Sequence, residues 1–165
     1  MSTPFLFEPP SGFDRAGLAA ALRRLAEARV YIGTSSWKYE GWLGQIYTRE
    51  RYLTRGRFSE RYFASACLAE YAETFPIVCG DFSFYQFPSA AYWERLFQSA
   101  SRDLLYGLKV PEDVTAKVFP AHARYGARGG TENPSFLNAA LFQDAFLGPL
   151  AVYHRQVAVL IFEFG

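Results

Sequence analysis

The sequence predicts an α/β protein in which four parallel strands are separated by helices. Two observations support this prediction. Short runs of β-branched and aromatic residues alternate with longer amphipathic stretches, and the strand-like runs are apolar at successive positions, as in strands buried on both faces. Two architectures have this element order: a doubly wound open sheet, and part of a (β/α)8 barrel, which usually takes about 250 residues.

The composition is that of one folded domain, because half of the 165 residues are hydrophobic and 18% are aromatic. A formal net charge of +1 gives no global field that would attract nucleic acid, so a nucleic-acid partner stays an open question. The sequence has neither a signal-peptide pattern nor an apolar run long enough to cross a bilayer. Cys67 and Cys79 lack a paired spacing, and we therefore expect a cytoplasmic protein with free thiols and no membrane partner.

The chain is expected to begin with an irregular segment and a capped helix. Residues 1–13 contain three prolines and form the irregular lead-in, and residues 14–165 form the domain. Asp14 can cap a helix in which Leu18 and Leu22 recur at helical spacing. This amphipathic helix is expected to cover one end of the domain.

The later elements follow in regular alternation. Strands are expected at 30–32, 77–85, 104–110 and 157–164, and crossover helices at 59–75, from Ser89 onward and at 134–146. The first strand, 30–32, is expected to be buried and to stop at Gly33. The last strand is the most hydrophobic, so it is expected to be fully buried.

Four motifs, in order along the chain, resemble the domain-of-unknown-function 72 family (YecE-like). They are IGTSSWKYEGW at 32–42, DFSFYQFP at 81–88, LKVPEDVT at 108–115, and FLNAALFQDAFLGPL running on to LIFEFG at 160–165. The resemblance covers nearly everything from Tyr31 onward. It implies a TIM-type (β/α)8 barrel, of which this chain is the first half, a fragment truncated at its C-terminus. The family has no established biochemical activity.

One position departs from the pattern of the family that the chain resembles. In the family that the chain resembles, the second strand looks as if it carries a Val-Glu pair. In this chain Val78 is followed by Cys79, which stands where the glutamate would be. Asp81, Phe84 and Tyr85 match the motif. If the family's acid is catalytic or a ligand, this chain lacks it.

Candidate site residues follow from the rule that barrel enzymes place their reacting groups where strands end. This rule selects Asp81, Lys109 and Glu163 as catalytic candidates, with Lys109 neutralising an anion and a carboxylate acting as general base. A structural ion pair between Lys109 and Glu163 is the competing interpretation. The expected ligand-binding residues are Ser35, Ser36, Trp37, Tyr39, Ser83 and Tyr85. Neither His122 nor His154 has the spacing of a metal ligand, so no metal site is predicted, and no motif identifies a cofactor.

Three functional hypotheses remain open. The first is a hydrolase or lyase that acts on a phosphorylated, sugar or nucleic-acid-like substrate at the ends of the strands. The second is a non-catalytic protein that binds a small-molecule or nucleotide-like ligand in the same place. The third is an inactive truncated fragment, which would expose two sheet edges and self-associate through them.

Overall fold

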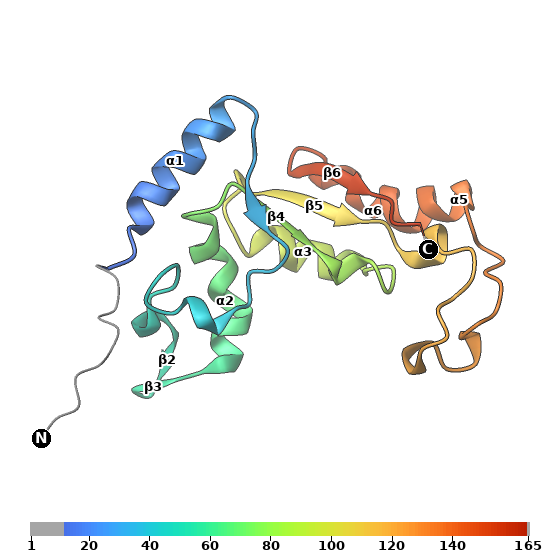
Figure 1. Ribbon diagram of the computed structural model, residues 1–165, viewed down its shortest axis with the longest axis horizontal. Helices are drawn as coiled ribbons and strands as arrows, with labels where there is room; N and C mark the ends of the chain where they lie inside the picture. Colours follow the sequence, from blue (N-terminus) through green and yellow to red (C-terminus); the bar gives the residue numbers. More distant parts are fainter. Residues whose placement is uncertain (1–11, 165) are drawn as a thin grey trace, which may run out of the picture.

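The computed structural model describes residues 12–164 and contains one parallel four-stranded sheet (Figure 1). The strand order is β1-β4-β5-β6, and all three neighbouring pairs are parallel. The strands are β1 (Gly33–Thr34), β4 (Ile77–Gly80), β5 (Leu105–Lys109) and β6 (Val157–Ile161). The prediction of a parallel α/β sheet is confirmed. Within the described residues the sheet is open, with β1 and β6 at its edges.

Helices connect these strands, and the first helix of the chain begins at its predicted cap, Asp14. The helices are α1 (Arg15–Glu27), α2 (Glu60–Ala72), α3 (Ala90–Gln98), α4 (Glu112–Thr115), α5 (Ala139–Phe142) and α6 (Gly148–Leu150), with a π-helical segment at Gln143–Leu147 between the last two. The side chains of Asp14, Ser59 and Ser89 accept hydrogen bonds from backbone N–H groups in the first turns of α1, α2 and α3. Figure 1 shows α1 projecting from the β1 end of the sheet, far from α5 and α6.

The long connection before α2 carries short elements. It contains 3-10 turns at Glu40–Trp42 and Arg49–Tyr52 and a hairpin of β2 (Leu53–Thr54) and β3 (Arg57–Phe58). Glu70 on α2, which is 2% exposed, anchors this connection by accepting hydrogen bonds from Thr48 and from the Tyr52 hydroxyl at 2.7 Å. Arg15 Nη1 donates to the same carboxylate at 3.0 Å, so Glu70 also holds the start of α1.

One face of the sheet carries the core. Val78, Tyr106 and Leu108 point to this face and are fully buried. They pack in one cluster with large side chains from the helices, among them Phe63, Leu68, Trp93, Phe97, Phe146 and Leu150. The core therefore lies between the sheet and a layer formed by α2, α3 and the α5–α6 segment.

The other face is open. Cys79, Gly107 and Val159 are neighbours in register on three adjacent strands and share this face. A Cβ at Gly107 would lie 2.2 Å from Cys79 Sγ and 3.2 Å from Val159 Cγ1, so these two side chains meet over the glycine. Ile77 and Leu105 on the same face are half-buried, and Val159 is 45% exposed. No described helix packs over them, although a parallel sheet is normally covered on both faces.

The prediction that residues 30–32 form a buried strand is wrong. Val30, Tyr31 and Ile32 are 49%, 43% and 46% exposed, and only Gly33–Thr34 pairs with β4. The pairing of β1 with β4 starts at Gly33 because its partner, Ile77, is the first residue of β4. Ile77 directly follows Pro76, which has no N–H group to donate to a neighbouring strand.

The prediction of a fully buried last strand is also wrong. β6 ends at Ile161, and beyond Val159 the side chains of Phe162 and Phe164 are 43% and 61% exposed. The reason is that only β5 pairs with β6 among the described residues, so the apolar sequence has nothing against its outer edge.

Two further boundaries differ from expectation. The strand at 77–85 stops at Gly80, because Asp81–Ser83 forms a 3-10 turn instead of continuing the alternation. The helix expected at 134–146 begins after Asn138, whose side chain accepts a hydrogen bond from Leu141 N, and runs on through Leu150. Of the expected irregular lead-in, residues 1–11 lie outside the described part of the chain.

Candidate functional site at the carboxyl end of the sheet

Three side chains from three neighbouring strands meet at the carboxyl end of the sheet. Asp81 follows β4, Lys109 ends β5, and Glu163 lies two residues beyond β6. The Nζ atom of Lys109 lies 2.9 Å from Asp81 Oδ1 and 2.7 Å from Glu163 Oε2. We call these three residues the rim triad. The structure thus brings together the three residues that were predicted to be catalytic.

The turn after β4 fixes the position of Lys109. Ser83, which is fully buried, donates a hydrogen bond from Oγ to the backbone carbonyl of Lys109 at 2.6 Å. The Lys109 ammonium lies 5.3 Å from the centre of the Phe84 ring, and Phe84 O accepts a hydrogen bond from Glu112 N. The side chains of Asp81 and Glu163 are 54% and 52% exposed, so both carboxylates are open to a ligand.

The two carboxylates determine the charge state of Lys109. Hydrogen bonds from the ammonium to Glu163 and to Asp81 raise the pKa of Lys109 well above its usual range. Lys109 therefore stays protonated at physiological pH, and the role of general base falls to a carboxylate. Each carboxylate oxygen is bonded to the same nitrogen, so the two oxygens are less than about 6 Å apart.

A cavity of about 300 Å³, the Tyr85 pocket, is linked to Lys109 through the ring of Phe84. It is lined by Tyr85, Glu112, Arg124, Tyr125 and Arg128. The carboxylate of Glu112, which is 3% exposed, accepts a hydrogen bond of 2.5 Å from the Tyr125 hydroxyl. Burial, aided by this hydrogen bond, raises the pKa of Tyr125 to about 12, so the hydroxyl remains a donor.

The two arginines of the Tyr85 pocket are held differently. The Arg124 guanidinium lies 4.0 Å from the centre of the Tyr85 ring, and no carboxylate among residues 12–164 forms an ion pair with it. Arg128 donates from Nη1 to Asp113 at 2.8 Å. Tyr85 in turn lies edge-on to Phe84, with ring centroids 5.0 Å apart, so an aromatic pair connects the pocket with Lys109.

The predicted ligand-binding residues after β1 contact the turn that carries Asp81 but not the triad side chains themselves. Ser35 and Ser36 are exposed, and Tyr39, which is 57% exposed, packs edge-on against Trp42. Trp37 is only 8% exposed and packs against Phe82, with ring centroids 5.6 Å apart. No hydrogen bond or ion pair joins these four predicted residues to the triad in the described part of the chain. They remain predictions.

Sequence reasoning missed most of the Tyr85 pocket. Glu112 follows the end of β5 and satisfies the rule that selected Lys109, so the sequence did contain a signal for it. Arg124 and Arg128 lie between α4 and α5, in a 3-10 segment at Ala123–Arg128. No sequence periodicity places such a loop over a particular strand end.

Further observations concern metal ligands, thiols and membrane spans among the described residues. Within 12–164 no three histidine, cysteine, aspartate or glutamate side chains are grouped so that they could hold a metal ion. The two histidines, His122 and His154, are exposed, and Cys67 and Cys79 are free thiols. None of the described helices has the length and apolar character needed to span a membrane.

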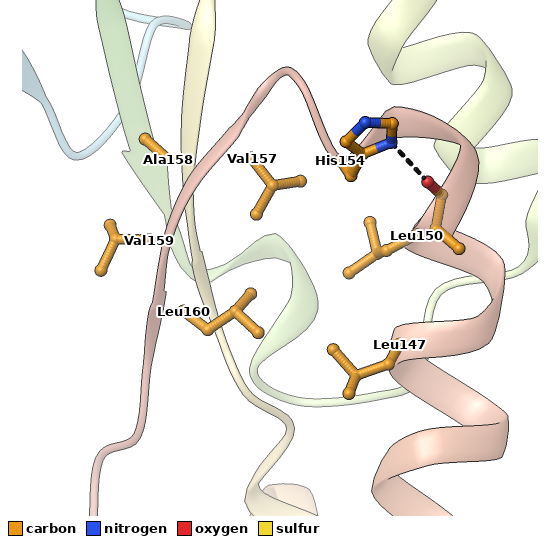
Figure 2. A pocket seen from close by; sticks show the side chains of 8 residues that line it. Leu147, Leu150, His154, Val157, Ala158, Val159 and Leu160 are labelled. Atoms are coloured by element: carbon orange, nitrogen blue, oxygen red, sulfur yellow. Dashed lines mark hydrogen bonds between the residues drawn. The ribbon is translucent and has the colours of Figure 1, made fainter.

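A second cavity, of about 310 Å³, lies beside the outer edge of β6 and holds none of the triad (Figure 2). Leu147 and Leu150 on the helical side face Val157 and Leu160 on the strand (Figure 2). The His154 ring at one end of this apolar groove is bonded to the backbone, with Nδ1 lying 3.0 Å from Ala151 O. Apart from His154, the side chains that line the groove are apolar.

Comparisons with known proteins identify a family and nothing closer. Neither the curated proteins nor the solved structures give a significant match. The family model described as "Protein of unknown function DUF72" matches residues 31–164, which include all four strands and the rim triad. The chain belongs to this DUF72 family.

Proposed function

We propose that the rim triad and the Tyr85 pocket form a site that binds a small hydroxylated, sugar-like molecule, on which the protein acts as a hydrolase or lyase. The observation that carries this proposal is the convergence of Asp81, Lys109 and Glu163 from three adjacent strands. Parallel sheets place ligands and reacting groups at this end of their strands.

The geometry supports a separate role for each member of the triad. Asp81 and Glu163 are accessible carboxylates, so either can accept a proton from a hydroxyl group or from water. Lys109 remains an ammonium and can stabilise negative charge that develops on a substrate oxygen. In this proposal the carboxylates are the catalytic base candidates and Lys109 the electrostatic stabiliser.

The charges around the site favour a neutral ligand over a phosphorylated one. The triad and the Tyr85 pocket, counted with Asp113, contain four carboxylates and three cationic side chains, a formal charge of −1. A phosphate group would need a surplus of positive charge. Hydroxyl groups, in contrast, can donate to the carboxylates and accept from the guanidinium groups. Of the phosphorylated, sugar and nucleic-acid-like classes, the sugar class therefore fits best.

We propose further that the four strands are one half of a (β/α)8 barrel and that the protein is cytoplasmic. The all-parallel order β1-β4-β5-β6 supports the barrel, as does the open face around Cys79 and Val159. Two free thiols support a reducing compartment.

The test of the site is ligand binding by matched lysine variants. Thermal shift with a panel of neutral mono- and disaccharides, and with their phosphorylated counterparts, identifies ligands that stabilise the wild type. Lys109→Met is expected to abolish the shift, and Lys117→Met, at an exposed lysine outside the site, to preserve it. Retained binding by Lys109→Met would refute the site. Binding of phosphorylated sugars alone would refute the ligand class.

A non-catalytic binding protein is the second candidate, favoured by Cys79 in the position where the family resemblance places an acid. Cys79 Sγ lies against Gly107 on the open face and not at the rim. Turnover assays on any sugar that binds separate the two candidates. An enzyme should lose turnover in Glu163→Gln or Asp81→Asn while retaining the fold, whereas a binding protein shows thermal stabilisation and no turnover in the wild type.

A further inference from the structure

We propose that a groove between α2, α3 and the loop after β1 binds a small organic acid, with the carboxylate at Lys38 and Arg95 and the hydrocarbon part against the floor of the groove. The groove has a volume of about 240 Å³ and contains no residue of the rim triad or of the Tyr85 pocket. We call it the Trp37 groove. The residues that matter here are Trp37, Lys38, Leu68, Tyr92, Arg95 and Leu96. The site is therefore independent of the function proposed for the rim.

The floor of the Trp37 groove reaches the hydrophobic core. Leu68 on α2, Leu96 on α3 and Trp37 are 2%, 6% and 8% exposed and belong to the main core cluster. Because they also line the groove, an apolar group placed there would contact core side chains. Such contact removes apolar surface from water and favours binding. The floor thus suits the hydrocarbon part of a ligand.

Two exposed cationic side chains stand at this apolar floor. The Nζ atom of Lys38 lies 5.4 Å from the centre of the Trp37 ring, and Arg95 lies in the last turn of α3. Neither forms an ion pair with a carboxylate of residues 12–164. The described residues that line the groove include no aspartate or glutamate. Both positive charges are therefore available to an anion.

Carboxylates occur near the groove along the chain, but they do not line it. They belong to Glu40, Glu60 and Glu94. Oε1 of Glu94 accepts a hydrogen bond from Gln98 Nε2 at 3.2 Å, and adjacent residues of a helix point in different directions, so Glu94 does not neutralise Arg95. Glu60 is followed on α2 by the exposed Arg61, which offsets its charge. The local balance remains positive.

Two neutral hydrogen-bond donors add to the cations. The backbone of Trp37 and of Tyr92 forms hydrogen bonds, but the indole N–H and the phenol hydroxyl have no partner among the described residues. Burial raises the pKa of Tyr92, and the charge of Arg95 only partly offsets burial, so the hydroxyl stays protonated near a guanidinium. A donor without a partner loses free energy that a ligand oxygen can restore. A carboxylate has two such oxygens.

The lining selects an acid over a sugar. Its free side-chain groups are donors, whereas the hydroxyls of Ser65 and Ser99 already donate to the carbonyls of Tyr62 and Leu96. A sugar would bring further hydroxyl donors and would place them against an apolar floor. A carboxylate brings acceptors only, and a monocarboxylate leaves the rest of the molecule apolar. An acid with a short aliphatic or aromatic body therefore fits best.

Trp37 acquires a role in this groove that differs from its predicted role at the rim. Its ring packs against Phe82, with centroids 5.6 Å apart, and Tyr92 lies against the same ring at 6.4 Å. Phe82 follows Asp81, so the groove adjoins the turn that carries Asp81 without including the triad. A ligand in the groove would change the surroundings of Trp37. Tryptophan fluorescence can therefore report binding.

Titration of the full chain with phenylacetate and with hexanoate tests the proposal. Calorimetry and tryptophan fluorescence should detect binding of both acids, and phenylacetamide, the neutral counterpart, should bind phenylacetate's site at least about tenfold more weakly because it lacks charge-assisted hydrogen bonds. Lys38→Met and Arg95→Met should each weaken phenylacetate binding about tenfold or more, and Tyr92→Phe by a smaller factor. Lys117→Met and Arg23→Met, at exposed residues outside the groove, should bind as the wild type does.

The remaining outcomes contradict the proposal. Absence of binding by both acids at millimolar concentration would refute it, and equal affinity for phenylacetamide would show that charge is not recognised. Tighter binding of inorganic phosphate would refute the carboxylate class. Loss of phenylacetate binding in Lys109→Met, with retention in Lys38→Met and Arg95→Met, would place the acid at the rim. A measurement on the wild type needs no variant to fold: affinity for phenylacetate should fall as the salt concentration rises, and a constant affinity would overturn the role of the cations.

Discussion

Lys109 shows how neighbouring groups restrict what one residue can do. The ammonium is bonded to two carboxylates, which raise its pKa and keep it charged. The same contacts hold Asp81 and Glu163 on either side of one nitrogen, although both carboxylates remain open to solvent. The sequence identified all three residues but left a structural ion pair and a catalytic role as alternatives. The geometry is compatible with both, because a group that orients two carboxylates can also stabilise charge on a ligand.

The raised pKa of Lys109 predicts a loss of stability in alkaline solution. Since its folded-state pKa lies above the unfolded value of about 10.4, Lys109 contributes stability that is fully present below that pH and is lost as the pH rises through the folded-state pKa. The free energy of unfolding of the wild type should therefore fall more steeply above about pH 10 than that of Lys109→Met. Urea denaturation of both proteins across this range measures the two slopes. If the free energies of unfolding of the two proteins fall with the same slope, the carboxylates do not bind the Lys109 ammonium in the dissolved protein.

At the level of single elements, α2 is the attachment point for α1 and for the long connection before it. Arg15 of α1 and Arg51 of the connection both reach Glu70 and Glu73. Burial alone would raise the pKa of Glu70, but hydrogen bonds from Thr48 and Tyr52 and the charge of Arg51 outweigh burial, and the pKa is lowered. The stability that Glu70 contributes is thus present above the unfolded pKa and is lost as the pH falls through the folded-state value.

The two glutamates of α2 should differ strongly when neutralised. Glu70→Gln leaves Arg15 without its buried partner and is expected to lower the free energy of unfolding by about 3 kcal/mol. Glu73→Gln removes ion pairs of the same two arginines at a side chain that is 47% exposed, and should cost less than about 1 kcal/mol. Chemical denaturation at neutral pH compares them. Equal effects would mean that burial of Glu70 does not distinguish the two sites.

The side chain of Cys79 occupies the space over Gly107, because Gly107 has no side chain of its own. Gly107→Ala would place a Cβ 2.2 Å from Cys79 Sγ, and we expect a loss of about 1–3 kcal/mol of stability from overpacking. Cys79→Ala removes that sulfur, so Gly107→Ala should cost less in the Cys79→Ala background. A double-mutant cycle by urea denaturation measures this coupling. Additive effects would show that the cost of the alanine arises elsewhere.

Local signals in the sequence predicted the elements that depend on local interactions. Asp14 caps its helix as expected, and the helices expected from Ser59 and from Ser89 also begin with a capping serine, because a cap needs only the next few residues. The strands at the two edges were predicted less well. Residues 30–32 and 157–164 have the composition of buried strands, but burial requires a neighbour, and hydrophobicity does not say whether that neighbour lies among the described residues.

For the whole molecule, the polarity of a parallel sheet explains why the triad was predictable and the Tyr85 pocket was not. Parallel strands end on the same side, and Asp81, Lys109 and Glu163 follow three strands that are neighbours in the observed order, so the rule that selected them also applies to their meeting. Arg124 and Arg128 depend on the path of a loop, which the sheet does not determine.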